Sequence, residues 1–171
     1  AHNIYGTQMA RATYEGVKKF AYPKRPFIIT RSAYSGAQRY TSSWTGDNIA
    51  TWEHLWIANI QMQRMSLSGM GFTGSDIGGF AEQPSPELYA RWIQLGVFHP
   101  FCRTHSSGHH GEQEPWSFGP EVVHITRKFV EIRYQLLPYL YTMFWQYVTD
   151  GIPLLKSLVY FDQEDTQTHY R

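Results

Sequence analysis

The run Trp44-Thr45-Gly46-Asp47-Asn48 places a carboxylic acid shortly after a large aromatic residue, in a turn that ends a polar segment. A carboxyl group packed against an indole with little water has its charged form disfavoured, which raises its pKa. Such a group can hold a proton near neutral pH and donate it to a bound substrate. The same residue types also suit the N-cap of a helix starting near Thr51, and for these residues taken alone capping is the favoured interpretation.

Charged, hydrogen-bonding and aromatic side chains recur at or just beyond the ends of predicted strands. They are Arg31, Trp44, Asp47, Asp76, Phe80 and His105. As a set they supply the charges, donors and flat rings that a ring-shaped, hydroxyl-rich substrate requires. Singly, each has a structural explanation, such as an ion pair between Arg31 and Asp76 or aromatic packing at a rim. These explanations are harder to sustain for the whole set.

The elements that would position these side chains alternate between helix and strand. Apolar residues at steps of three and four predict helices over 3–20, 51–68, 86–96 and 120–150, the last kinked at Pro138. Short apolar runs predict strands over 27–30, 70–73 and 97–105, and a new strand-bearing region over 154–161. This order predicts a parallel α/β fold, either an open doubly wound sheet or part of an eightfold β/α barrel. Three strands are too few to complete either architecture.

Composition narrows the class of partner. Fifteen basic residues against 14 acidic ones leave no basic stripe for nucleic acid and no polybasic patch for a membrane surface, and no apolar run is long enough to span a bilayer. The 12 Tyr, 10 Phe and 6 Trp suit stacking on sugar rings, although an aromatic-rich core would use the same residues. Cys102 is the single cysteine, which excludes an internal disulfide framework.

Two other motifs carry little weight. Gly69-Met70-Gly71-Phe72-Thr73-Gly74 matches the dinucleotide pattern G-x-G-x-x-G, but its glycines span a predicted strand and no helix opens directly behind them. Cys102, His105, His109 and His110 are of the types that bind zinc, but their spacing repeats no known ligand pair. We therefore expect neither a dinucleotide site nor a metal site here.

A string of longer motifs runs through nearly the whole chain. It comprises Arg31-Ser32 with Gly36-Ala37-Gln38-Arg39-Tyr40, Trp44-Thr45-Gly46-Asp47-Asn48, Gly74-Ser75-Asp76-Ile77-Gly78-Gly79-Phe80, Phe101-Cys102-Arg103-Thr104-His105, Glu114-Pro115-Trp116 and Arg133-Tyr134-Gln135-Leu136-Leu137-Pro138-Tyr139-Leu140-Tyr141. In this order the motifs resemble those of the family 31 glycoside hydrolases, the family of the α-glucosidases.

The resemblance implies a (β/α)8 TIM barrel and a retaining mechanism, in which one carboxyl protonates the leaving oxygen while another attacks the anomeric carbon. By similarity, Asp47 is the acid/base. The positions that line the sugar subsite beside the scissile bond are matched by Arg31, Trp44, Phe80 and His105. Asp76 is expected behind them, orienting Arg31 or His105. Because the carboxyl pair does the chemistry, the resemblance implies no metal and no organic cofactor.

One departure from the family pattern is important. The family's nucleophilic aspartate lies on an earlier strand, in a Trp-x-Asp-Met-Asn-like motif, and this sequence has no such motif. We therefore expect residues 1–155 to be the C-terminal half of the catalytic barrel and residues 156–171 to start a following β-sandwich domain. The remainder of the barrel is then required, and residues 1–171 alone should show no turnover.

The resemblance thus predicts part of an exo-acting α-glucosidase whose partner is an oligosaccharide or other α-glucoside substrate. Thr45 and Asn48, beside the acid, resemble the glucosidase branch more than the xylosidase or sulfoquinovosidase branches. An α-xylosidase, a transglycosylase or an α-glucan lyase on the same scaffold stays an alternative. From a different class, so does a non-catalytic sugar-binding homologue that keeps Arg31 and His105 but has lost its nucleophile.

Overall fold

The computed structural model describes residues 2–170. Its long helices are α1 (His2–Phe20), α2 (Trp52–Leu67), α3 (Pro86–Gly96) and α4 (Pro120–Asp150). The strands between them are short: β1 (Ser43–Trp44), β2 (Thr73–Gly74), β3 (Asp76–Ile77) and β4 (Arg103–Thr104). Brief helical turns complete the order, namely η1 (Ala37–Arg39), η2 (Pro115–Phe118), α5 (Leu158–Phe161) and η3 (Thr166–Tyr170).

The strand pairs of the described residues all run parallel. β1 pairs with β2, with Trp44 opposite Gly74, and β3 pairs with β4, with Asp76 opposite Arg103. Parallel neighbours need a crossover connection, and here helix α2 connects β1 to β2 while α3 connects β3 to β4. The chain is therefore built from successive strand–helix units.

Two further contacts extend these strand pairs. Ile29 forms a parallel bridge with Ser42 beside β1, and the backbone N–H of Phe101 donates to the carbonyl of Thr73 at 3.0 Å. The second approach is so close that a Cβ on Gly74 would meet the backbone oxygen of Phe101. β2 and β3 are consecutive parts of one stretch of chain, separated by Ser75. The order across the parallel segments, from Ile29 to β1, to β2 with β3, and to β4, therefore follows the order in the sequence.

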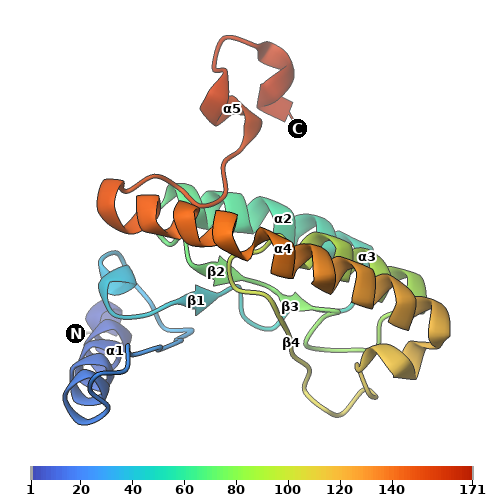
Figure 1. Cartoon of the computed structure of the whole chain (residues 1–171), viewed down its shortest axis with the longest axis horizontal. Coiled ribbons are helices and arrows are strands. Elements are labelled where there is room, and N and C mark those ends of the chain that lie inside the picture. The colour runs from blue at the N-terminus through green and yellow to red at the C-terminus, as the bar shows by residue number, and fades with distance from the viewer. Residues whose placement is uncertain (1, 171) are drawn as a thin grey trace.

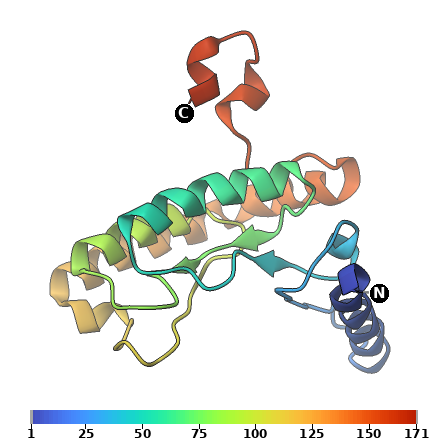
Figure 2. The same cartoon turned by 180° about the vertical axis from the view of Figure 1, so that it is seen from behind.

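Helices α2, α3 and α4 lie together on one face of these strands, and α1 lies at the end of the sheet near β1 (Figures 1 and 2). Within the described residues, the opposite face carries no layer of helices in either view. In a β/α barrel the helices surround the strands, whose other face lines the interior. Coverage on one side, with strands in chain order, is therefore typical of a barrel segment.

Local sequence explains where the helices begin. Thr51 caps α2 by accepting a hydrogen bond from the backbone N–H of His54 at 3.2 Å. Ser85 caps α3 in the same way for Leu88, and Pro86 occupies the first turn, where its missing N–H is not needed. These caps fix the ends of the loops that follow β1 and β3.

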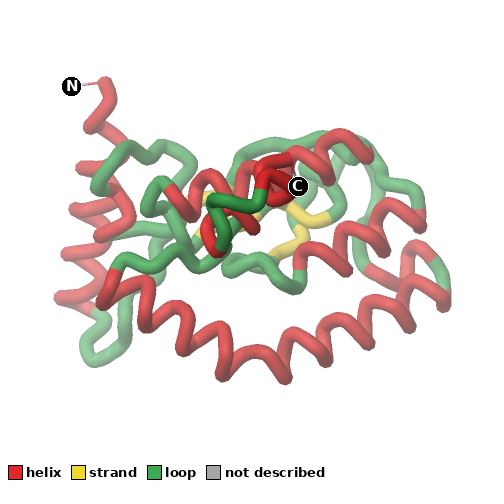
Figure 3. Tube along the Cα trace, turned by 90° about the horizontal axis from the view of Figure 1, so that it is seen from above, coloured by secondary structure: helices red, strands yellow, loops and turns green. Residues whose placement is uncertain are grey.

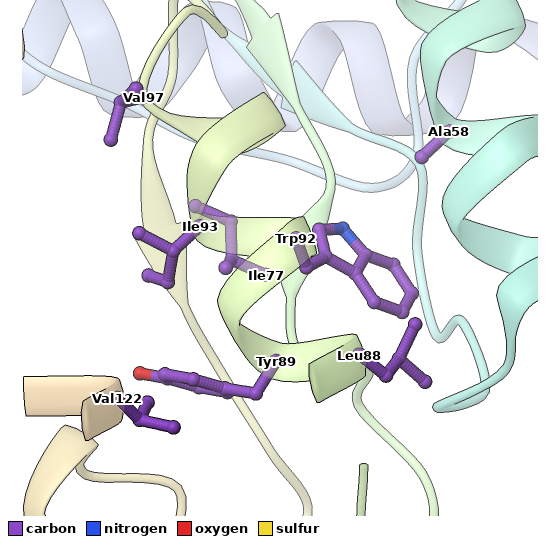
Figure 4. Close-up of a cluster of buried hydrophobic side chains, with 8 residues drawn as sticks. All are labelled: Ala58, Ile77, Leu88, Tyr89, Trp92, Ile93, Val97 and Val122. Atoms are coloured by element: carbon purple, nitrogen blue, oxygen red, sulfur yellow. The ribbon is translucent and has the colours of Figure 1, made fainter. Parts of the chain in front are cut away.

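The hydrophobic core lies where α3 packs against its neighbours (Figure 4). It consists of Ala58, Ile77, Leu88, Tyr89, Trp92, Ile93, Val97 and Val122. Tyr89 and Trp92 of α3 are fully buried, and the Tyr89 ring stacks on Phe118 with centroids 4.5 Å apart. Burial of a large apolar side chain contributes roughly 1.5–3 kcal/mol, so this cluster attaches α3 firmly to β3 and α4.

Arg133 of α4 holds the chain between α3 and β4. Its guanidinium donates to the carbonyls of Val97 at 2.6 Å, His99 at 2.7 Å and Pro100 at 3.0 Å. These carbonyls follow the last turn of α3 and have no helical partner, so the guanidinium satisfies them. The contact fixes the segment that leads into β4.

The helix predictions are confirmed within one or two residues, whereas some predictions for the rest of the chain need correction. β1 lies in the polar segment before the turn at 44–48, where no strand was predicted. Its hydroxyl side chains hide the strand pattern, and buried Ser43 donates to the carbonyl of Thr30 at 2.9 Å. Helix α4 runs on through Pro138 as one helix that follows an arc (Figure 3). None of the described helices is long and apolar enough to cross a membrane.

The segment 154–161, predicted to carry a strand, contains helix α5 instead. The backbone N–H of Tyr160 closes its turn on the carbonyl of Ser157 at 3.0 Å. A strand needs a neighbour to pair with, and Figure 1 shows this segment extending away from the sheet. The assignment of residues 156–171 to a following β-sandwich domain stays a prediction.

Candidate active site

The residues singled out in the sequence lie at or just beyond the carboxyl ends of the parallel strands, except Asp76, which lies at the start of β3, just after β2 ends. Trp44 ends β1, Asp76 begins β3 and His105 directly follows β4, while Arg31 follows the bridge at Ile29. Asp47 and Phe80 lie a few residues further along, after β1 and β3. The carboxyl ends of the strands are where parallel α/β folds place their active sites, because the loops there can vary without disturbing the sheet.

Arg31 and Asp47 form an ion pair across two of these loops. Nη1 of Arg31 donates to both carboxylate oxygens, at 3.2 and 3.1 Å. Asp47 does not cap the following helix, since Thr51 does so. Its side chain is 40% exposed within the described residues, so the burial against Trp44 on which the sequence argument relied is not present in this part of the barrel.

Asp76 is the most deeply buried of these groups, with no exposed surface. Its Oδ1 accepts a hydrogen bond from Nη2 of Arg103 at 2.8 Å, and its Oδ2 has no partner among the described residues. Burial raises the pKa of Asp76, against the hydrogen bond and the positive charge of Arg103, which lower it. Arg103, rather than Arg31 or His105, is thus the residue that Asp76 holds by a hydrogen bond.

Trp44 meets the same arginine. The guanidinium carbon of Arg103 lies 5.4 Å from the centroid of the Trp44 ring and 5.1 Å from that of Phe101. Both distances are within the range of cation–π contact. Trp44 is therefore linked to Asp76 through Arg103, although Trp44 and Asp76 come from different strand pairs.

Asn48 connects the loop of Asp47 to the loop of Phe80. Its side-chain amide donates to the carbonyl of Asp76 at 3.0 Å, and its side-chain oxygen accepts from the N–H of Phe80 at 2.9 Å. Phe80 in turn lies beside His105, with ring centroids 5.1 Å apart. A buried amide that bridges two backbone groups fixes both loops relative to each other.

Arg103 and the bridging role of Asn48 were not predicted from the sequence. A signal for Arg103 was present, because Phe101, Arg103 and His105 alternate along a strand and so share one face. No such signal existed for Asn48, whose partners lie 28 and 32 residues away along the chain.

No group of three or more His, Cys, Asp or Glu side chains among residues 2–170 is placed to hold a metal ion. Cys102 is partly buried, and burial raises the pKa of its thiol, which disfavours the thiolate that binds zinc. The glycines of 69–74 span β2, and the next helix, α3, begins only at Pro86. The site thus consists of charged, amide and aromatic side chains.

Parallel strands in chain order, helices on one face and polar groups at the carboxyl ends define a segment of a β/α-barrel protein. Residues 1–143 match the Glycosyl hydrolases family 31 TIM-barrel domain. The chain belongs to glycoside hydrolase family 31 and forms part of its TIM-barrel domain.

Individual relatives agree with this assignment. The chain is 44% identical over 169 residues to Alpha-glucosidase 2 of Bacillus thermoamyloliquefaciens, covering 99% of this chain and 21% of the relative. It is 43% identical over 159 residues to Glucosidase 2 subunit alpha of Saccharomyces cerevisiae, covering 92% and 17%. The chain thus spans about a fifth of the length of these curated relatives.

Solved structures show the same similarity. A family 31 α-glucosidase from Bacteroides thetaiotaomicron superposes with a TM-score of 0.94 at 41% identity, over 98% of this chain and 28% of that one. A glucosidase II alpha subunit bound to Tris superposes with a TM-score of 0.91 at 35% identity, over 94% of this chain and 18% of that one. The chain is homologous to α-glucosidases along nearly its whole length.

Proposed function

We propose that this chain supplies the acid/base side of the active site of an exo-acting, retaining α-glucosidase. One observation carries the proposal: Arg31 and Asp47 pair at the strand ends of a family 31 barrel segment that is 44% identical to an α-glucosidase. In this proposal the substrate is an oligosaccharide or another α-glucoside with a terminal α-linked glucose.

In the proposed reaction, Asp47 protonates the glycosidic oxygen while a second carboxylate attacks the anomeric carbon. Water then hydrolyses the glycosyl-enzyme, and Asp47 takes the proton of that water. Arg31 and His105 donate hydrogen bonds to sugar hydroxyls, and Trp44 and Phe80 pack against the sugar ring. The geometry of a retaining site requires the two carboxyls to lie about 5 Å apart.

We assign the second carboxylate to a part of the barrel outside residues 1–171. Asp76 is unsuited to the role, because its carboxylate is fully buried and bonded to Arg103. In this proposal residues 1–155 form the C-terminal half of the catalytic barrel, and the remainder of the barrel is required for turnover.

The test is Asp47→Ala in the polypeptide that carries these residues together with the remainder of the barrel. Substrates with poor leaving groups need protonation, so their kcat/KM should fall by about 10²–10⁴-fold. For activated aryl α-glucosides, whose leaving groups depart without a proton, the rate of the first step should fall much less. Added azide should restore turnover and give a glycosyl azide of retained configuration, because azide needs no general base.

Glu131→Gln is the control, since Glu131 is an exposed acid on α4 far along the chain from the strand ends. It should leave the rates for both substrate classes unchanged. An equal loss for good and poor leaving groups in Asp47→Ala, with no response to azide, would contradict the role of Asp47.

A second experiment tests the assignment of the nucleophile. A slow fluorinated glucosyl fluoride should trap the glycosyl-enzyme, and mass spectrometry of its peptides should find the label outside residues 1–171. Label on any carboxylate within 1–171 would overturn the assignment. Absence of both turnover and label in the intact barrel would favour the non-catalytic sugar-binding homologue.

A further inference from the structure

We propose that Arg103 is a positioning residue that fixes the orientation of the Trp44 indole in the wall of the sugar subsite. The proposal rests on the proposed function, which places Trp44 in that wall. The new element is that Arg103 orients the side chain of Trp44 without itself needing to contact the sugar.

The position of Arg103 is fixed from behind. Asp76 and Arg103 are opposite each other in the register of β3 and β4, and their side chains meet at 2.8 Å. Asp76 is fully buried, so its carboxylate cannot rotate into solvent, and Arg103 is 30% exposed. A charge-assisted hydrogen bond to an immobile acceptor holds the planar guanidinium in one orientation.

The orientation of Trp44 is not fixed by a hydrogen bond of its own. Its indole Nε1 is buried and has no hydrogen-bond partner among residues 2–170. Buried indole N–H groups usually find such a partner, so the ring depends on the surfaces that it packs against. Arg103 supplies one of these surfaces, with its guanidinium carbon 5.4 Å from the ring centroid.

Phe101 completes the arrangement. It precedes Arg103 on the same strand face, and its ring centroid lies 5.1 Å from the guanidinium carbon. Arg103 therefore contacts a buried acid and two aromatic rings. A substitution that changes the shape of its side chain alters the packing of Trp44 directly. Because Arg103 packs over part of the indole of Trp44, a bound sugar would contact the part of the ring that Arg103 leaves uncovered.

A simpler role would be charge compensation, in which Arg103 only neutralises the buried Asp76. The two roles make different demands on the side chain. Lysine preserves the positive charge but lacks the planar fork that stacks on an aromatic ring. Arg103→Lys thus keeps the compensation and removes the stacking.

The experiment uses Arg103→Lys in the polypeptide that carries the whole barrel, with an α-glucoside as substrate. A displaced indole loses part of its ring contact with the sugar, and aromatic contacts are worth up to about a tenfold change in affinity, so KM should rise by up to about tenfold. The value of kcat should change by less than about threefold, because a displaced ring weakens ground-state and transition-state binding alike. The thermal unfolding midpoint should stay near that of the wild type.

A double-mutant cycle with Trp44→Ala shows whether Arg103 acts through the indole. If it does, Arg103→Lys raises KM in the wild type but not in the Trp44→Ala background, since residues that act as a unit are non-additive. An undiminished effect of Arg103→Lys in that background, or an unchanged KM in a folded Arg103→Lys protein, overturns the proposal.

Asp76→Asn provides a second route to the same answer, should Arg103→Lys fold poorly. It keeps the shape of the buried group and removes the charged anchor of Arg103, so KM should again rise only where Trp44 is present. The wild type separates the two proposals: if it neither binds nor cleaves α-glucosides, the proposed function fails. If it is active and the cycle shows no coupling, only the role of Arg103 fails.

Discussion

The guanidinium of Arg31 reaches both carboxylate oxygens of Asp47, a residue 16 positions further along the chain. The contact depends on tertiary structure, because Arg31 follows the segment of Ile29 that pairs in parallel with Ser42, just before β1. Both side chains remain accessible, at 59% and 40% exposure. Because the pair is open to solvent, Arg31 can exchange its hydrogen bonds to Asp47 for one to a substrate hydroxyl.

Replacing Arg31 with methionine should therefore affect activity much more than stability. An exposed ion pair contributes about 0–1 kcal/mol, so the free energy of unfolding should change by no more than about 1 kcal/mol. A lost charge-assisted hydrogen bond to substrate is worth about 1.5–3 kcal/mol, so kcat/KM should fall by about 10–100-fold. Denaturant unfolding and steady-state kinetics on the same preparation measure both quantities.

Arg11→Met is the matched control for Arg31→Met. Arg11 also forms an exposed ion pair, with Glu15 at 2.8 Å, but it lies on α1 away from the strand ends. Its replacement should leave kcat/KM unchanged. If both substitutions lowered kcat/KM alike, or if neither did, Arg31 would have no role in the sugar subsite.

His99 predicts a pH dependence of stability. Burial, and to a smaller degree the charge of Arg133, lowers the pKa of His99 to about 4 in the folded chain, against about 6.5 when unfolded. The unfolded chain thus binds the proton more readily than the folded chain. The free energy of unfolding therefore has its full value, as far as His99 is concerned, above about pH 6.5, and it falls as the pH decreases through about 4. The loss should reach about 3 kcal/mol.

Denaturant unfolding between pH 8 and pH 4 tests this dependence with His99→Leu. Neither ring nitrogen of His99 has a hydrogen-bond partner among the described residues, so leucine removes the titration without removing a bond. Its stability should fall less steeply with pH than that of the wild type. His124→Gln, at an exposed position of α4, should keep the slope of the wild type. An unchanged slope in His99→Leu would show that other groups cause the dependence.

Two glycines separate the effect of backbone conformation from that of close packing. Gly79 and Gly108 both have positive φ, at 90° and 77°. A Cβ on Gly79 would lie 2.6 Å from Cα of Ala50, whereas Gly108 has open space around it. Gly108→Ala should cost about 1–2 kcal/mol of unfolding free energy from conformation alone. Gly79→Ala should cost a further 1–3 kcal/mol or so from overpacking, as measured by denaturant unfolding. Equal losses would mean that the loop after β3 can move away from Ala50, which lies just before α2.

The fold could be predicted from sequence where local patterns determine it. Helix α3 has its cap at Ser85 and its apolar face within one segment, so its bounds were clear in advance. β1 could not be found in this way, since buried Ser43 is satisfied by a hydrogen bond to the carbonyl of Thr30, which directly follows the bridge residue Ile29. The helix at Leu158–Phe161 was missed for a related reason, because its apolar residues suggest a strand while no strand is available to pair with.

The candidate site shows the same division. The strand ends and the motifs around Asp47 and His105 were visible in sequence. The partner of Asp76 was not, because the choice between Arg31 and Arg103 is made by the register of β3 against β4. The exposure of Asp47 also lay beyond sequence reasoning, since burial depends on what surrounds the turn in space.

The close approach of Gly74 to the backbone of Phe101 affects the spacing of the strands around the barrel. With a side chain at this position, β2 would have to move away from the backbone of Phe101. In a closed barrel the circumference is fixed by its strands, so a wider spacing here would have to be absorbed by the other spacings or by a change in tilt. A methyl group at Gly74 would therefore alter the diameter of the barrel, and with it the distance between side chains on opposite walls.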